Sequence, residues 1–151
     1  MKSRRIILVG WDGADWKVAH PLMDSGEMPQ LNNIVENGTM GNLASFPPYL
    51  SPMLWNTIST GKHPHKHGIC GFSEVDEVSG KVRAISSQTR KCKAIWNILT
   101  EQGRNCHVLG WFASHPAEAI NGTCVSEAFA RPSGKIGGDW PVPKASVYPS
   151  G

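Results

Sequence analysis

The first residue whose type and place could support chemistry is Asp12, in the stretch LVGWDG. It follows the apolar run Ile6–Val9, which predicts a buried strand, and in open α/β sheets ligands bind beyond the carboxyl ends of the strands. A carboxylate there is a hard, anionic ligand that suits Zn²⁺, Mg²⁺ or Mn²⁺. The alternative is that Asp12 belongs to an Asp-Gly turn, a common way for a strand to end. A dinucleotide site is not indicated, because no GxGxxG follows the strand.

The second candidate is Ser51, in PPYLSPMLWNTISTG. Pro52 suits the first position of a helix, and this predicts that Ser51 is the N-cap. A hydroxyl at a helix N-terminus lies among backbone N–H groups and at the positive end of the helix dipole, where phosphate oxygens are held. A serine is a poor nucleophile unless a base or a metal helps to deprotonate it. No base has a suitable local spacing, so we expect a metal to activate Ser51 if it is a nucleophile.

The third candidate is the histidine tract of His63, His65 and His67, in KHPHKHG. Their alternation could place all three on one side of an extended strand, and histidine is the commonest metal ligand. Pro64 and the flanking lysines favour an exposed loop instead. We therefore favour a structural or solvated role for these histidines over a metal site.

The elements that must position these residues alternate between strands and helices. Continuous or extended apolar runs predict strands at Arg5–Val9, Thr39–Phe46 and Asn105–Trp111. Helical spacing predicts helices at Asp15–Met23, Pro29–Glu36, Ser51–Thr60 and Lys91–Gln102. A hairpin is expected within Ser73–Ser86, with Ser79-Gly80 at its turn. This order indicates an α/β sheet with right-handed crossovers.

Composition excludes several classes of protein. A chain of 151 residues with 40% apolar and 18% charged residues matches one ordinary globular domain. The net charge of +3 comes from scattered residues, so no nucleic acid polymer is expected as a partner. No run is long enough for a membrane span, and the run before Gly10 is too short for a signal peptide, which predicts a cytoplasmic protein. The four cysteines form no CxxC pair and are expected to be free thiols, mostly in the core.

Three segments together resemble the N-terminal part of the alkaline phosphatase superfamily, and most of all its type I phosphodiesterase/nucleotide pyrophosphatase branch. They are IILVGWDGAD, MPQLNNIVENGTMGNLASFPPYLSPMLWNTISTGKHPHKHGICGF and AIWNILTEQGRNCHVLGWFASHPAEAINGTCVSEAFA, within residues 5–130. The resemblance implies a three-layer α/β/α fold with a mostly parallel sheet. On this reading, residues 1–130 are the N-terminal part of a catalytic domain, and the Gly/Pro-rich residues 131–151 are a connection or loop.

The resemblance also implies a chemistry. Asp12 would bind one of two divalent metal ions, zinc above all, with manganese or magnesium as alternatives. Ser51, ten residues before Gly61, would be the metal-bound nucleophile that attacks the phosphorus of a small-molecule phosphoric ester. A covalent phosphoserine would form, and metal-activated water would hydrolyse it. His67 occupies the family's His-Gly position and is expected to be structural.

Some features depart from the family pattern. Leu54 stands where the nucleotide pyrophosphatases have an asparagine that binds the phosphoryl oxygen, and Ser51-Pro52-Met53 lacks the arginine of the sulfatase motif. The family's remaining metal ligands lie further along the chain, so we expect a longer parent enzyme and little or no activity from these 151 residues alone. Two alternatives stay open: a phosphotransferase or phosphomutase of the same superfamily, and a non-catalytic α/β binding domain in which Asp12 is a turn and Ser51 only a cap.

Overall fold

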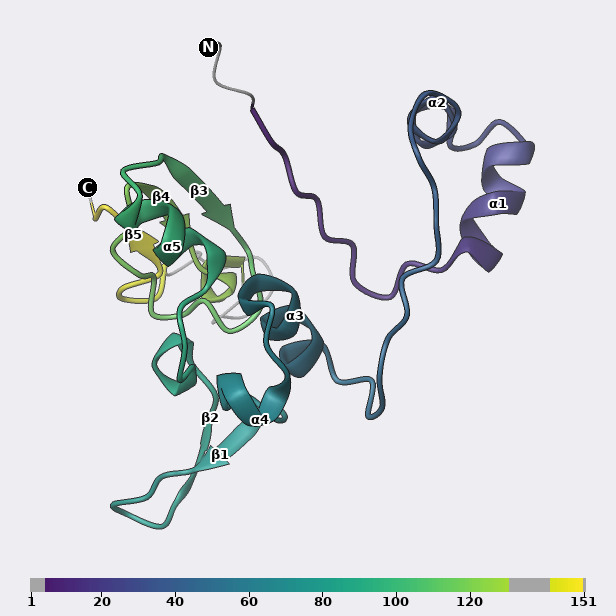
Figure 1. Ribbon diagram of the computed structural model, residues 1–151. Helices are drawn as coiled ribbons and strands as arrows, with labels where there is room; N and C mark the ends of the chain where they lie inside the picture. Colours follow the sequence, from purple (N-terminus) through teal and green to yellow (C-terminus); the bar gives the residue numbers. More distant parts are fainter. Residues whose placement is uncertain (1–4, 131–141, 151) are drawn as a thin grey trace. The chain divides into compact units, whose positions relative to one another are not determined.

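The computed structural model describes residues 5–130 and 142–150 and divides the chain into two compact units, residues 1–44 and 45–151 (Figure 1). The first unit contains helices α1 (Trp16–Asp24) and α2 (Pro29–Asn37), and both confirm their predictions to within one residue. The side chain of Asp15 caps α1 by accepting a hydrogen bond of 2.9 Å from the backbone N–H of Lys17. Pro29 begins α2, where its missing N–H costs nothing.

The two strands predicted for the first part of the chain are wrong. Residues 5–14 and 39–46 have no strand pairing, and Ile6, Ile7, Leu8 and Val9 are 64–90% exposed. The apolar run has the composition of a buried parallel strand, but a strand also needs a neighbour that takes up its backbone hydrogen bonds. The described residues provide no such neighbour for this run.

The second unit begins with helix α3 (Ser51–Thr60), which confirms the predicted helix. Gly61 ends α3 in the left-handed conformation, with φ +63°, and its N–H donates to the carbonyl of Thr57. The prediction that Ser51 is the N-cap is wrong by one position: Leu50 is the extended capping residue and Ser51 is the first helical residue. One more helical turn, α4 (Pro64–His67), follows where an extended strand or a loop was considered.

The predicted hairpin is confirmed as strands β1 (Ser73–Val75) and β2 (Val82–Ala84), which pair antiparallel. The side chain of Asp76 holds the turn, because its Oδ1 accepts hydrogen bonds of 2.8 Å from both the N–H and the hydroxyl of Ser79. A short 3₁₀ helix, η1 (Ser87–Thr89), leads from the hairpin towards the next helix.

The rest of the second unit is a helix packed on a three-stranded sheet. Helix α5 (Ile95–Glu101) is shorter than the predicted Lys91–Gln102, because it begins where Asn97 Oδ1 accepts a hydrogen bond of 2.8 Å from the N–H of Ala94. Strand β3 (Cys106–Leu109) confirms the predicted strand at shorter length. It pairs in parallel with β4 (Gly122–Val125), and β4 pairs antiparallel with β5 (Val147–Tyr148). A second 3₁₀ helix, η2 (Glu127–Ala130), follows β4.

The core lies between α5 and this sheet, which are side by side in Figure 1. It consists of Ala94, Trp96, Val108, Ile120 and Cys124. Of the four free cysteines only Cys124 is buried, so the expectation that most of them lie in the core is wrong.

The described strands establish a mixed α/β chain with one parallel pair. The three-layer, mostly parallel sheet stays a prediction, as does the division at residue 130, since residues 131–141 lie outside the described part. No helix within the described residues is long and apolar enough to cross a membrane.

Candidate active site

Ser51 is the first residue of α3, and the side chain of the capping residue, Leu50, makes no hydrogen bond to this end. In α1, by contrast, the Asp15 carboxylate accepts a hydrogen bond from the backbone N–H of Lys17. The start of a helix presents N–H groups and a partial positive charge, which together favour a bound anion such as phosphate. The position of Ser51 therefore suits a hydroxyl that reacts with a phosphoryl group.

Helix α3 is held in place by the segment that follows β3. The indole Nε1–H of Trp111 donates to the carbonyl of Trp55 over 3.1 Å, and the two indole rings meet edge to face at 4.9 Å. The side-chain amide of the fully buried Asn56 donates to the carbonyls of Pro52, at 2.8 Å, and Phe112, at 3.4 Å. The carboxyl end of a parallel strand thus carries the helix that begins with Ser51.

His67 fastens the other side of α3. It is fully buried, its Nδ1 accepts a hydrogen bond of 3.2 Å from the N–H of Ile69, and its Nε2 lies 3.1 Å from the hydroxyl of Thr57. The Thr57 hydroxyl donates onward to the carbonyl of Met53, so it accepts from Nε2–H and the ring is the neutral Nε2–H tautomer. Burial first, and then the positive charge of Arg90, lower the pKa of His67. The predicted structural role of His67 is confirmed.

Arg90 belongs to a buried polar network beside α5. Its side chain is 2% exposed and forms an ion pair of 2.5 Å with the carboxylate of Glu118. The same carboxylate accepts hydrogen bonds from Trp96 Nε1, at 2.8 Å, and from Asn97 Nδ2, at 3.1 Å. The guanidinium also lies over the ring of Trp96, 5.1 Å from its centroid. This network joins Arg90, which precedes α5, and Glu118, which lies between β3 and β4, to the core residue Trp96.

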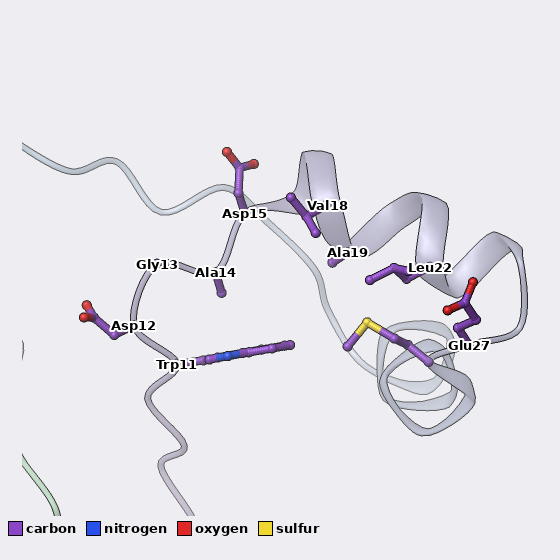
Figure 2. A pocket seen from close by; sticks show the side chains of 10 residues that line it. Trp11, Asp12, Gly13, Ala14, Asp15, Val18, Ala19, Leu22 and Glu27 are labelled. Carbon is purple, nitrogen blue, oxygen red and sulfur yellow. The ribbon is translucent and has the colours of Figure 1, made fainter.

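Asp12 lies in the first unit, in a turn that Ala14 N–H closes on the carbonyl of Trp11. Gly13 occupies the left-handed region at φ +70°, so the Asp-Gly turn considered from the sequence is present. Asp12 lines one end of a hollow of about 360 Å³ between this turn and α1 (Figure 2). Asp12 and Ser51 belong to different units.

The ligands that a metal ion would need are present only in part. Asp12 offers the oxygen donor that Zn²⁺, Mn²⁺ and Mg²⁺ accept. No three His, Cys, Asp or Glu side chains within residues 5–130 and 142–150 lie close enough together to hold an ion. His63 and His65 are exposed and their rings stack at 5.9 Å, without a third ligand beside them. The described residues therefore fit one ligand of a metal site and do not complete the site.

A family model decides the broader assignment. The model of the type I phosphodiesterase / nucleotide pyrophosphatase family matches residues 6–142. The chain belongs to this family. A search of the curated proteins and a search of the solved structures gave no significant match to this chain. Membership in a type I phosphodiesterase family supports hydrolysis of phosphoric esters, with small-molecule phosphoesters as the class of substrate, and the family is known for its dependence on divalent metals.

Several positioning residues of this phosphodiesterase-family chain were missed from the sequence. Asn56, Thr57 and Trp111 hold α3, yet each looked like an ordinary member of a helix or strand. One signal was available: Asn56 interrupts the apolar face of α3, and a buried polar side chain must find hydrogen-bond partners. Its partner, the Phe112 carbonyl, lies 56 residues away along the chain, and no local pattern indicates it.

Proposed function

We propose that this chain carries the nucleophile and one metal ligand of a metal-dependent phosphoric-ester hydrolase of the phosphodiesterase type. Ser51 is the proposed nucleophile and Asp12 the proposed ligand. The family match over residues 6–142 supports the reaction class, and the place of Ser51 as the first residue of a helix supports its role. The remaining ligands of the two-metal site are proposed to come from residues outside those described.

In the proposed reaction the Ser51 hydroxyl loses its proton and its oxygen attacks phosphorus. The bond from phosphorus to the ester's alcohol breaks as the serine–phosphorus bond forms, and the alcohol leaves with a proton. Water then cleaves the phosphoserine, which returns the serine hydroxyl and releases phosphate or a phosphomonoester. When bound, the divalent ions would lower the pKa of the serine hydroxyl and neutralise charge on the phosphoryl oxygens.

The chain's own residues keep the nucleophile in place during this reaction. Trp111 and Asn56 fix α3 to the end of β3, and His67 fixes it through Thr57. The N-terminal partial charge of α3 favours the negative phosphoryl group over the neutral product alcohol. A rigid helix start therefore presents the hydroxyl and the anion-binding amides together.

Replacing Ser51 in the expected longer parent enzyme, loaded with metal, tests the proposal with bis-p-nitrophenyl phosphate as the substrate. Ser51→Ala is expected to lower kcat by at least about 1,000-fold, as for other covalent nucleophiles. The free energy of unfolding should change by no more than about 1 kcal/mol, since Ser51 is not the capping residue. Ser73→Ala, in the exposed β1 strand, is the matched control and should leave kcat unchanged. Full turnover by Ser51→Ala would refute the proposed nucleophile.

A further inference from the structure

Asn56 is a fully buried residue of α3 whose side chain is only partly hydrogen-bonded. Its Nδ2 donates to the carbonyl oxygens of Pro52, at 2.8 Å, and Phe112, at 3.4 Å, and because both are acceptors the nitrogen, not Oδ1, faces them. Oδ1 has no hydrogen-bond partner within the part of the chain that the structure describes. An acceptor buried in this way lowers stability, because it has given up its hydrogen bonds to water. The benefit of an asparagine here therefore lies in the bonds from Nδ2.

The bond from Asn56 to Pro52 contributes little to the helix itself. In a regular α-helix the carbonyl of residue 52 already accepts the backbone N–H of residue 56, so this oxygen has a donor without the side chain. Thr57 makes the same kind of local bond, from its hydroxyl to the carbonyl of Met53 at 3.0 Å. The bond to Phe112 is of another kind, because it joins α3 to the segment that follows β3, 56 residues along the chain.

Two neighbouring residues of α3 are bound to two neighbouring residues that follow β3. The carbonyl of Trp55 accepts from Trp111 Nε1 at 3.1 Å, and Asn56 Nδ2 donates to the carbonyl of Phe112. One bond holds a helix at one point and leaves it free to turn about that point, whereas two bonds on neighbouring residues restrict the turn. The bond from Asn56 therefore sets the rotation of α3, on which the direction of the Ser51 side chain depends.

We propose that Asn56 is a positioning residue that aligns Ser51 with the phosphoryl group, at some cost to the stability of the helix that carries both. The inference rests on the proposed function, because it concerns the attack of Ser51 on phosphorus. Asn56 is buried and stands five positions after Ser51, so it acts through the helix and not by contact with the reacting atoms. Reaction rates depend steeply on such alignment: a displacement of about 1 Å can lower a rate about 100-fold.

Asn56→Leu tests the proposal in the expected longer parent enzyme, loaded with metal, with bis-p-nitrophenyl phosphate as the substrate. Leucine has the same branched shape, but it lacks both the donor and the unpartnered oxygen. We expect kcat to fall at least about tenfold and KM to change less than about threefold. The thermal midpoint should rise or stay within about 3 °C of the wild type, because the buried acceptor is gone. Wild-type kcat in the folded variant would overturn the proposal.

A second variant separates the two bonds of Asn56 and keeps the test decisive if the leucine variant does not fold. The hydroxyl of Asn56→Thr can donate to the carbonyl of Pro52, as Thr57 does to that of Met53, but it is too short to reach Phe112. Asn56→Thr should therefore lower kcat as far as Asn56→Leu does. Wild-type kcat in Asn56→Thr would show that the bond to Phe112 does not align the nucleophile.

Ser59→Ala is the matched control within α3. Ser59 is also buried, and its hydroxyl donates within the helix, to the carbonyl of Asn56 at 3.3 Å, so kcat should stay unchanged. A readout without catalysis is the exchange of the Trp111 indole proton with deuterium in the 151-residue chain. Asn56→Leu should speed this exchange at least about threefold, because α3 opens locally more often, and Ser59→Ala should not. Equal exchange rates in the wild type and Asn56→Leu would also overturn the proposal.

The variants of Ser51 and Asn56 separate this inference from the proposed function. If Ser51→Ala abolishes turnover while Asn56→Leu and Asn56→Thr keep the wild-type kcat, the positioning role fails alone. If Ser51→Ala keeps full turnover, the proposed function fails, and the alignment of Ser51 fails with it. Loss of turnover in Ser51→Ala together with a lowered kcat and faster indole exchange in Asn56→Leu supports both.

Discussion

Removing the carboxylate of Glu118 should destabilise the second unit far more than its place near the surface suggests. The Glu118 side chain is 22% exposed, but the Arg90 side chain that it neutralises is only 2% exposed. In Glu118→Ala the guanidinium would remain buried without its counter-charge, and Trp96 Nε1–H and Asn97 Nδ2–H would lose their acceptor. Breaking a buried ion pair from one side costs about 3–5 kcal/mol.

The exposure of Glu118 sets the expected value at the lower end of this range, because water can reach the vacated place. We expect a loss of about 3 kcal/mol in the free energy of unfolding. With a urea m-value of about 2 kcal/mol/M, this moves the unfolding midpoint down by about 1.5 M. Urea titrations followed by tryptophan fluorescence measure the shift, and Trp96 reports directly from the network.

Two further variants sharpen this measurement. Glu118→Gln keeps an oxygen acceptor without the charge and should fall between the wild type and Glu118→Ala. The matched control is Glu101→Ala, which removes the carboxylate of the Lys93–Glu101 pair, whose side chains are 61% and 51% exposed. Such an exposed pair contributes about 0–1 kcal/mol. If Glu118→Ala costs no more than Glu101→Ala, the buried-charge reasoning is refuted.

Three other outcomes are expected. Gly122→Ala should strongly destabilise the β3–β4 pair, because a Cβ at Gly122 would lie 2.0 Å from the carbonyl oxygen of Cys106 and the glycine has φ +142°. Gly41→Ala is the control: a Cβ there would have no atom within 4 Å, so the thermal midpoint should stay unchanged. Equal midpoints for the two variants would contradict this prediction. The pKa of His67 in the folded chain lies below 6.5, the histidine value of the unfolded chain, so the unfolded chain binds the proton more readily. The stabilisation from His67 is therefore complete above pH 6.5 and declines as the pH falls towards the folded pKa. Urea midpoints between pH 5 and pH 8 should show this slope in the wild type and a smaller one in His67→Gln, and identical slopes would count against it. The 151-residue chain alone should show no Zn²⁺-stimulated hydrolysis of bis-p-nitrophenyl phosphate, because no three metal-binding side chains lie together among the described residues. Metal-dependent turnover that requires Ser51 would disprove this expectation.

Local signals predicted the elements that depend on local interactions. The helices of the first unit, α3 and the β1–β2 hairpin are confirmed, because caps, proline positions and turn residues act within a few residues. The strands at residues 5–9 and 39–46 were predicted from composition, but strand formation depends on a pairing partner that composition does not reveal. Strand β4 was missed because its few residues acquire their strand conformation through pairing with β3 and β5.

The candidate site shows the same division. The family resemblance pointed to Ser51 and Asp12 through ordered motifs, and the family match confirms the family while their roles stay proposals. The contacts that hold α3, from Trp111 to Trp55 and from Asn56 to Phe112, join residues 56 positions apart. Side chains separated in this way meet only through the fold, so no spacing in the sequence could have indicated them.

The indoles that hold α3 also give the protein an optical property. Trp55 meets Trp111 at 4.9 Å, and Trp111 meets Trp96 at 6.0 Å, so three tryptophans form a continuous chain from α3 to α5. Chromophores this close share their excited states, and their near-ultraviolet circular dichroism depends on their mutual angles. A change in that signal would report, without any added label, that the helix bearing Ser51 has moved relative to Trp111.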